Sequence, residues 1–87
     1  MDIACLIQAF CDETDGYEFY NNYSGRFMFG KKCVGIVYDD TSTVMMDLSQ
    51  YLFEHGISDV RSALGTICYD NLGLQYIVYF SNVETNL

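Results

Sequence analysis

The residues from Cys33 to Tyr38 constrain the fold more than any other segment of the chain. They are nearly all apolar, and Val34, Ile36 and Val37 are β-branched. This pattern is typical of a central strand that is covered on at least one face. Gly35 inside the run indicates that a neighbour packs closely against it. The chain is therefore expected to build a sheet around this strand.

Two other segments show the apolar spacing of amphipathic helices, residues 2–11 and residues 44–55. Asp2 lies near the positive end of the first helix dipole. Several possible N-capping residues at 39–43 precede the second helix, and Gly56 follows it as a C-terminal stop. The apolar faces are marked by Ile3, Leu6, Ile7 and Phe10 in the first segment and by Val44, Met45, Leu48, Tyr51 and Leu52 in the second.

Further strands are expected on both sides of residues 33–38. Residues 17–20 are expected to form a short strand or an ordered loop. Residues 21–25 are turn-forming and are expected in a turn, and a hairpin is predicted around Gly30. Residues 66–70 and 74–80 flank an Asn-Leu-Gly turn, which predicts a second, antiparallel hairpin.

Two segments have weaker patterns. Residues 57–64 fit either a helical turn or the start of an extended segment, and we expect a short strand or turn. The polar tail from residue 82 to residue 87 is expected to fray. The chain has no internal repeat and no proline to mark a linker. The sequence thus predicts one α+β domain over residues 1–87, with two helices packed on one face of a small, mainly antiparallel sheet of three to five strands.

Charge and length restrict the classes of function. The chain has 87 residues, with 12 Asp or Glu against 4 Lys or Arg and a formal net charge of −8. Because 51% of the residues are hydrophobic, this is not a disordered acidic tail. The shortage of Lys and Arg argues against direct nucleic-acid binding, so a partner is expected to be a protein with a basic surface. There is no room for a large enclosed active site, and no apolar stretch approaches the ~20 residues that span a bilayer.

No pattern in the sequence indicates catalysis. The one histidine, His55, falls in the last turn of the second predicted helix, where it is expected to cap rather than catalyse. The four cysteines, Cys5, Cys11, Cys33 and Cys68, form no C-x-x-C pair and follow no signal peptide. Free thiols in a reducing cytosol are therefore expected. We expect no enzymatic activity, no cofactor and no metal, and a cytoplasmic location in the host cell.

The carboxylates gather in two places. Two interpretations stay open for them. Net charge keeps a small aromatic-rich domain soluble, and a dense row of carboxylates can also occupy the place of DNA phosphates on a basic surface. The first group follows the first predicted helix and the second lies between the central strand and the second helix: Asp12, Glu13, Asp15 and Glu18, then Asp39 and Asp40.

Basic and aromatic residues alternate around the first predicted hairpin. Three of the four basic residues, Arg26, Lys31 and Lys32, lie within seven positions and are interleaved with aromatics. They could contact RNA or phosphate, or they could protect an edge strand or pair with the acidic cluster. If the segment is functional, its mixed charge favours a protein partner. The neighbouring Tyr20 and Tyr23 are candidates for the same contact, since aromatic residues are enriched at protein interfaces.

The chain resembles the anti-CRISPR proteins of phages and mobile elements in size, acidity and its Tyr/Asn-rich loop on a small α+β domain. The segments that carry a similarity to small proteins of such elements are Tyr23-Ser24-Gly25-Arg26 to Cys33-Val34-Gly35-Ile36, Leu64-Gly65 and Asp70-Asn71-Leu72-Gly73-Leu74. Anti-CRISPR proteins share no common motif, so the resemblance assigns no role to a residue. It implies inhibition of a CRISPR effector at a surface that binds DNA or reads the PAM.

The leading hypothesis is a non-enzymatic inhibitor that docks on a basic surface of a nucleic-acid-binding complex as a DNA or PAM mimic. The alternative is an intracellular adaptor or assembly protein that uses the aromatic and basic segment for a protein partner or a homodimer. A monomer and a homodimer are both compatible with the sequence. The candidate partner-binding residues are Asp12, Glu13, Asp15, Glu18, Tyr20, Tyr23, Asp39 and Asp40.

Overall fold

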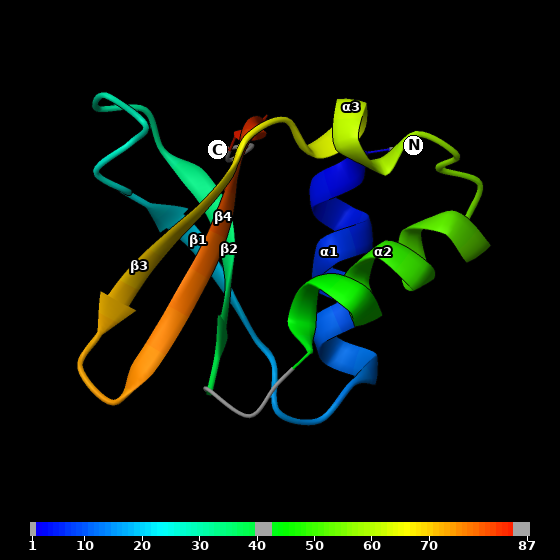
Figure 1. Cartoon of the computed structure of the whole chain (residues 1–87), viewed down its shortest axis with the longest axis horizontal. Coiled ribbons are helices and arrows are strands. Elements are labelled where there is room, and N and C mark those ends of the chain that lie inside the picture. Colours follow the sequence, from blue (N-terminus) through cyan, green and yellow to red (C-terminus); the bar gives the residue numbers. More distant parts are fainter. Residues whose placement is uncertain (1, 40–42, 85–87) are drawn as a thin grey trace.

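An antiparallel sheet forms the centre of the fold (Figure 1). The computed structural model describes residues 2–39 and 43–84, and over these ranges the sheet has four strands in the order β1-β2-β4-β3. The expected α+β class is confirmed, and the predicted strand at residues 33–38 is one of the two inner strands. The strands are β1 (Glu18–Tyr23), β2 (Cys33–Tyr38), β3 (Ile67–Leu72) and β4 (Gln75–Glu84).

Helices cover one face of this sheet (Figure 1). They are α1 (Ile3–Glu13), α2 (Val44–Glu54) and the short α3 (Val60–Leu64). The Asp2 side chain caps α1 by accepting a hydrogen bond from the Ala4 N–H at 3.0 Å. Gly56 follows α2 with φ of 92°, as predicted for a residue that ends a helix. No helix within the described ranges has the length and apolar character needed to cross a membrane.

The expectation of a strand or turn at residues 57–64 is wrong, because Val60–Leu64 form the helix α3. Asp59 is the reason, because its carboxylate accepts hydrogen bonds from the Ser62 N–H at 3.2 Å and from the Ser62 hydroxyl at 2.8 Å. This N-cap starts a helix that is too short to show a period of its own. Gly65, with φ of 78°, ends it.

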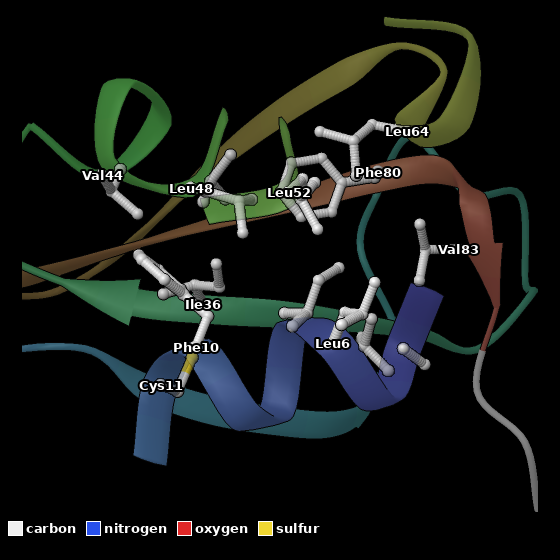
Figure 2. Packing of buried hydrophobic residues seen from close by; sticks show 14 residues of the cluster. Leu6, Phe10, Cys11, Ile36, Val44, Leu48, Leu52, Leu64, Phe80 and Val83 are labelled. Atoms are coloured by element: carbon white, nitrogen blue, oxygen red, sulfur yellow. The ribbon is translucent and has the colours of Figure 1, made fainter. Parts of the chain in front are cut away.

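The main core lies between the helices and the sheet (Figure 2). Leu6 and Phe10 of α1 point toward Ile36 of β2, and Leu48 and Leu52 reach the same layer from α2 (Figure 2). Leu48, Leu52 and Ile36 have no exposed surface. The helical spacing found in the sequence thus corresponds to the faces that are buried.

A second, smaller core lies on the opposite face of the sheet, under the loop formed by residues 24–32, which we term the aromatic loop. Met28 of this loop is buried against Ile77 and Tyr79 of β4. Gly25 packs on the Tyr79 ring so closely that a Cβ at this position would overlap it. Gly35 likewise leaves room for Ile77, as the sequence indicated.

The second predicted hairpin is confirmed, whereas the expectation of a hairpin around Gly30 is wrong, because residues 24–32 form a loop. β1 and β2 are antiparallel, but the aromatic loop joins them in place of a tight turn at Gly30, and β1 includes residues 21–23, which were expected in a turn. β3 and β4 close around Gly73 and Leu74. The expectation of a frayed tail is wrong for residues 82–84, because β4 continues there and pairs Glu84 with Cys33. Residues 85–87 lie outside the described residues.

Candidate protein-binding surfaces

Carboxylates from four parts of the chain meet at one end of the molecule. The loop from α1 to β1 places Glu18 at the start of β1, where it pairs with Val37 of β2. Asp39 follows two positions after Val37, so both carboxylates lie at the same end of the sheet. Asp40, the last predicted member, lies outside the described residues. We term this region the acidic end, and its described members are Asp12, Glu13, Asp15, Glu18, Asp39 and Asp47.

Asp47 joins this group although the sequence analysis did not include it. The Tyr17 hydroxyl, in the loop before β1, donates a hydrogen bond of 2.6 Å to the Asp47 carboxylate in the first turn of α2. The Thr43 hydroxyl donates a second one at 3.1 Å. No local pattern singled out Asp47, which lies seven residues after Asp40 and within the second predicted helix.

Two tyrosines fix the carboxylates to the helix layer. The Tyr51 hydroxyl of α2 donates a 2.7 Å hydrogen bond to Glu13 at the end of α1. This bond, with the negative charge of Glu13, raises the pKa of Tyr51 to about 12. The Phe10 ring packs against both Tyr17 and Tyr51, with centroids 5.3 and 5.4 Å apart. The acidic end is therefore built on an ordered aromatic support.

The basic residues belong to the aromatic loop and α3, which lie at the end of the molecule opposite the α1–β1 loop (Figure 1). Two ion pairs occur in the described part of the chain, Arg26 with Asp70 at 3.0 Å and Lys31 with Glu84 at 3.2 Å. Neither involves the acidic end, so the basic loop does not neutralise the acidic cluster. Asp12, Glu13, Asp15 and Glu18 are exposed. We term this second region the basic end, which consists of Arg26, Lys31, Lys32 and Arg61.

The structure separates the two candidate tyrosines from the acidic end. Tyr20 and Tyr23 point to the sheet face that carries the aromatic loop, where their rings pack 5.6 Å apart. Tyr23 also packs on Tyr79 at 5.3 Å and donates a 2.7 Å hydrogen bond to Asp70. Tyr23 thus supports the fold, while Tyr20 is 44% exposed.

Asp70 anchors the aromatic loop to the sheet. It accepts hydrogen bonds from Tyr23 and Arg26. Burial acts to raise its pKa, but the hydrogen bonds from Tyr23 and Tyr79 and the Arg26 charge outweigh this and lower it. Burial and the same carboxylate raise the pKa of Tyr23. Asp70 is therefore held as the charged partner of this cluster.

The aromatic loop presents two phenylalanines to solvent. Phe27 is 53% exposed, and the Arg26 guanidinium carbon lies over it, 5.1 Å from the centroid of the Phe27 ring. Phe29 is 93% exposed and has φ of 53°, a left-handed conformation that is uncommon for an aromatic residue. Between this loop and β3 lies an open groove of about 710 Å³, lined by Arg26, Phe27, Phe29, Thr66, Ile67, Cys68, Tyr69 and Ser81.

The remaining titratable groups have structural surroundings. All four cysteines are free thiols, and burial raises the pKa of Cys11 to about 12 and raises the pKa of Cys33 and Cys68. The His55 ring lies against Tyr51, and its Nδ1 is 2.8 Å from the Tyr51 carbonyl oxygen. No group of three metal-ligating side chains converges within residues 2–39 and 43–84.

Comparison of the chain with family models, with curated proteins and with solved structures finds no match.

Proposed function

We propose that this chain is a non-enzymatic inhibitor that docks its acidic end on a basic, nucleic-acid-binding surface of a protein complex. One observation carries the proposal: exposed carboxylates from α1, its following loop and β1 gather at one end, while both ion pairs of the described residues lie elsewhere. Exposed carboxylates that share an end produce a concentrated negative potential, which steers a basic partner to that end.

The spacing of charge supports mimicry of a nucleic acid. The molecule measures 32 × 27 × 21 Å. A duplex carries one charge per about 1.7 Å of its axis, so a length equal to the shortest dimension carries on the order of 12 phosphates. The six described carboxylates of the acidic end amount to about half this number of charges, enough to replace several phosphates on a basic surface.

A CRISPR effector complex is the proposed target, acting in the cytoplasm of the host cell. The resemblance to anti-CRISPR proteins supports this choice, and effectors of the Cas9 type hold duplex DNA and read the PAM with Arg and Lys. The acidic end would then compete with the DNA duplex for these side chains. The chain itself binds no nucleic acid in this proposal.

The test combines capture with a matched pair of charge reversals. A tagged chain is expressed in cells that contain a CRISPR system, and the captured complex is then tested for binding of a PAM-containing duplex. Asp15→Lys should weaken displacement of the duplex by about tenfold or more, since it reverses a charge at the acidic end. Glu54→Lys gives the same net charge from the exposed end of α2 and should have a smaller effect. Equal effects of the two variants would show that net charge, and not a binding site at the acidic end, determines competition with the duplex.

The second candidate function is that of an adaptor or assembly protein that uses the aromatic loop. The observation that favours it is Phe29, which is almost fully exposed on a left-handed backbone. Phe29 lines the groove together with the exposed Phe27, Ile67 and Tyr69, and a contiguous exposed apolar patch is typical of an interaction surface. Phe29→Ser should abolish capture of a protein partner, or self-association, with the fold intact. Retention of both would exclude this function.

A further inference from the structure

The β3 edge of the sheet is open. Thr66 accepts a 3.0 Å hydrogen bond from the Ser81 N–H of β4, and antiparallel ladders alternate between bonded and non-bonded pairs. Cys68 and Asp70 therefore direct their backbone groups to β4. Ile67, Tyr69 and Asn71 direct theirs outward, where no strand of the described ranges pairs with them.

This edge lacks the features that usually prevent pairing. The other edge strand, β1, carries an exposed Glu18 and an irregular register next to Asn22 at φ of 61°, and both discourage a further strand. β3 has neither a proline nor a lysine. Its one charge, on Asp70, is bound to Arg26. The apolar side chains exposed along it or at its turn are Ile67, Tyr69, Leu72 and Leu74.

The two ends of this edge differ in shape. At the start of β3 the groove of about 710 Å³ lies between the edge and the aromatic loop. At the end of β3, Leu72 is 38% exposed and Leu74, in the turn, is 98% exposed. One end thus has an apolar hollow, and the other has apolar side chains that project.

We propose that a second copy of this chain occupies the β3 edge, in antiparallel orientation around a two-fold axis at Tyr69. Antiparallel pairing brings Ile67 of one copy opposite Asn71 of the other, and Thr66 opposite Leu72. Leu72 shares the sheet face of Cys68, the face that the aromatic loop covers. This pairing places Leu72 and Leu74 of each copy at the groove of the other. The contacts are therefore reciprocal, as a closed two-fold interface requires.

Charge selects the orientation and the register. Reversal of the strand direction places the acidic ends of the two copies at opposite ends of the joined sheet, which limits the repulsion between them. A two-fold axis at Asp70 would use an equal length of strand, but it would place the two carboxylates directly opposite each other, which is unfavourable. The Tyr69 register avoids this and pairs Asp70 with Cys68 of the other copy.

This inference rests on the second candidate function for its surface and is independent of the acidic-end proposal, because the interface uses none of the acidic-end residues. Sedimentation equilibrium of the full chain over a range of concentrations tests it. The mass should rise from that of the 9.9 kDa chain toward twice that value. Salt should strengthen the dimer by screening the repulsion between two chains of net charge −8. A monomer at all concentrations up to ~1 mM would overturn the proposal.

Matched variants locate the interface. Leu74→Glu should raise the dissociation constant of the dimer at least tenfold. Phe53→Glu changes an exposed apolar residue of α2 and should leave this constant unchanged. Equal effects would place the interface elsewhere. The native chain could instead stay monomeric and capture a different protein. If Phe29→Ser abolishes that capture, the dimer is overturned and the adaptor function is retained.

Cysteine cross-linking tests the register. In a Cys5→Ser background, which removes the exposed native thiol, Tyr69→Cys should form a disulfide-linked dimer on mild oxidation. Cα atoms of a hydrogen-bonded antiparallel pair are about 5.5 Å apart, within the range that a disulfide spans. Ile67→Cys alone and Asn71→Cys alone should stay uncross-linked, while a mixture of the two should cross-link. Efficient cross-linking of Ile67→Cys with itself would contradict the register.

Discussion

The two faces of the sheet are covered by different means. The helices of the described residues cover one face and bury a continuous core that includes Leu48, Leu52 and Phe80. The aromatic loop covers the other face, and it is held by Met28, by Gly25 against Tyr79 and by the hydrogen bonds of Asp70. The helix-covered face depends on apolar burial over many residues, whereas the loop-covered face depends on a few specific contacts. We therefore expect the two faces to respond differently to mutation.

The largest expected difference is between two core truncations. Leu48→Ala should lower the free energy of unfolding by about 3–4 kcal/mol, because the helices cannot move to fill the cavity. Met28→Ala should cost about 2 kcal/mol or less, because the aromatic loop can settle into the space. Urea denaturation of both variants measures this difference. Equal losses would show that the loop is packed as rigidly as the helices.

The next effect concerns the anchor of the aromatic loop. Asp70→Asn should lower the free energy of unfolding by about 1–2 kcal/mol, since a charged acceptor of several hydrogen bonds becomes neutral. Glu84→Gln, in an exposed ion pair with Lys31, is the matched control and should cost less than about 0.5 kcal/mol.

The same anchor predicts a pH dependence. The pKa of Asp70 is lowered from 3.8 in the folded state. The resulting stabilisation is fully present above the unfolded-state value and is lost as the pH falls through the lower folded-state value. Thermal unfolding between pH 2 and 6 should show a smaller acid-induced loss for Asp70→Asn than for the native chain. An unchanged profile would remove Asp70 from this role.

A smaller effect is expected on the helix-covered face, at the hydrogen bond between α1 and α2. Tyr51→Phe removes the donor to Glu13 and should lower the free energy of unfolding by about 0.5 kcal/mol. The folded-state pKa of Tyr51 is about 12, against an ordinary value of 10.0. Its stabilisation is therefore present below pH 10 and is lost as the pH rises through 12. Spectrophotometric titration should show one late-titrating tyrosine fewer in Tyr51→Phe.

The smallest effect on stability should come from Phe29. Phe29→Gly removes an exposed ring and relieves a left-handed backbone, so stability should stay within about 0.5 kcal/mol of the native chain or rise slightly. The adjacent Met28 is buried, so Met28→Ala should by contrast lower the free energy of unfolding. A loss above about 1 kcal/mol for Phe29→Gly would mean that the ring supports the loop-covered face.

The helix-covered face could be predicted because its elements repeat a local pattern. Leu48 and Leu52 follow helical spacing, and the β-branched run of β2 marks an inner strand. The loop-covered face could not, because Met28 and Phe29 are neighbours of similar hydrophobicity with opposite burial. Their burial differs because Met28 contacts β4, which is distant in the sequence, and Phe29 does not.

The same distinction applies to the candidate site. The grouping of Asp12 with Asp15 followed from their closeness in sequence. The addition of Asp39 depends on the pairing of Glu18 with Val37, and that of Asp47 depends on the Tyr17 hydrogen bond across the helix layer. Neither contact leaves a local pattern in the sequence. The short α3 was missed for a related reason, since its start depends on the single cap at Asp59.

The first and last described residues lie close together, and this has a practical consequence. Asp2 and Glu84 line one hollow of about 470 Å³ together with Lys31, at the side of the molecule remote from the α1–β1 loop (Figure 1). A tether attached at either terminus therefore orients the chain with Asp15 facing away from the support. An immobilised chain would offer its carboxylates to a soluble partner without obstruction, whichever terminus carries the tag.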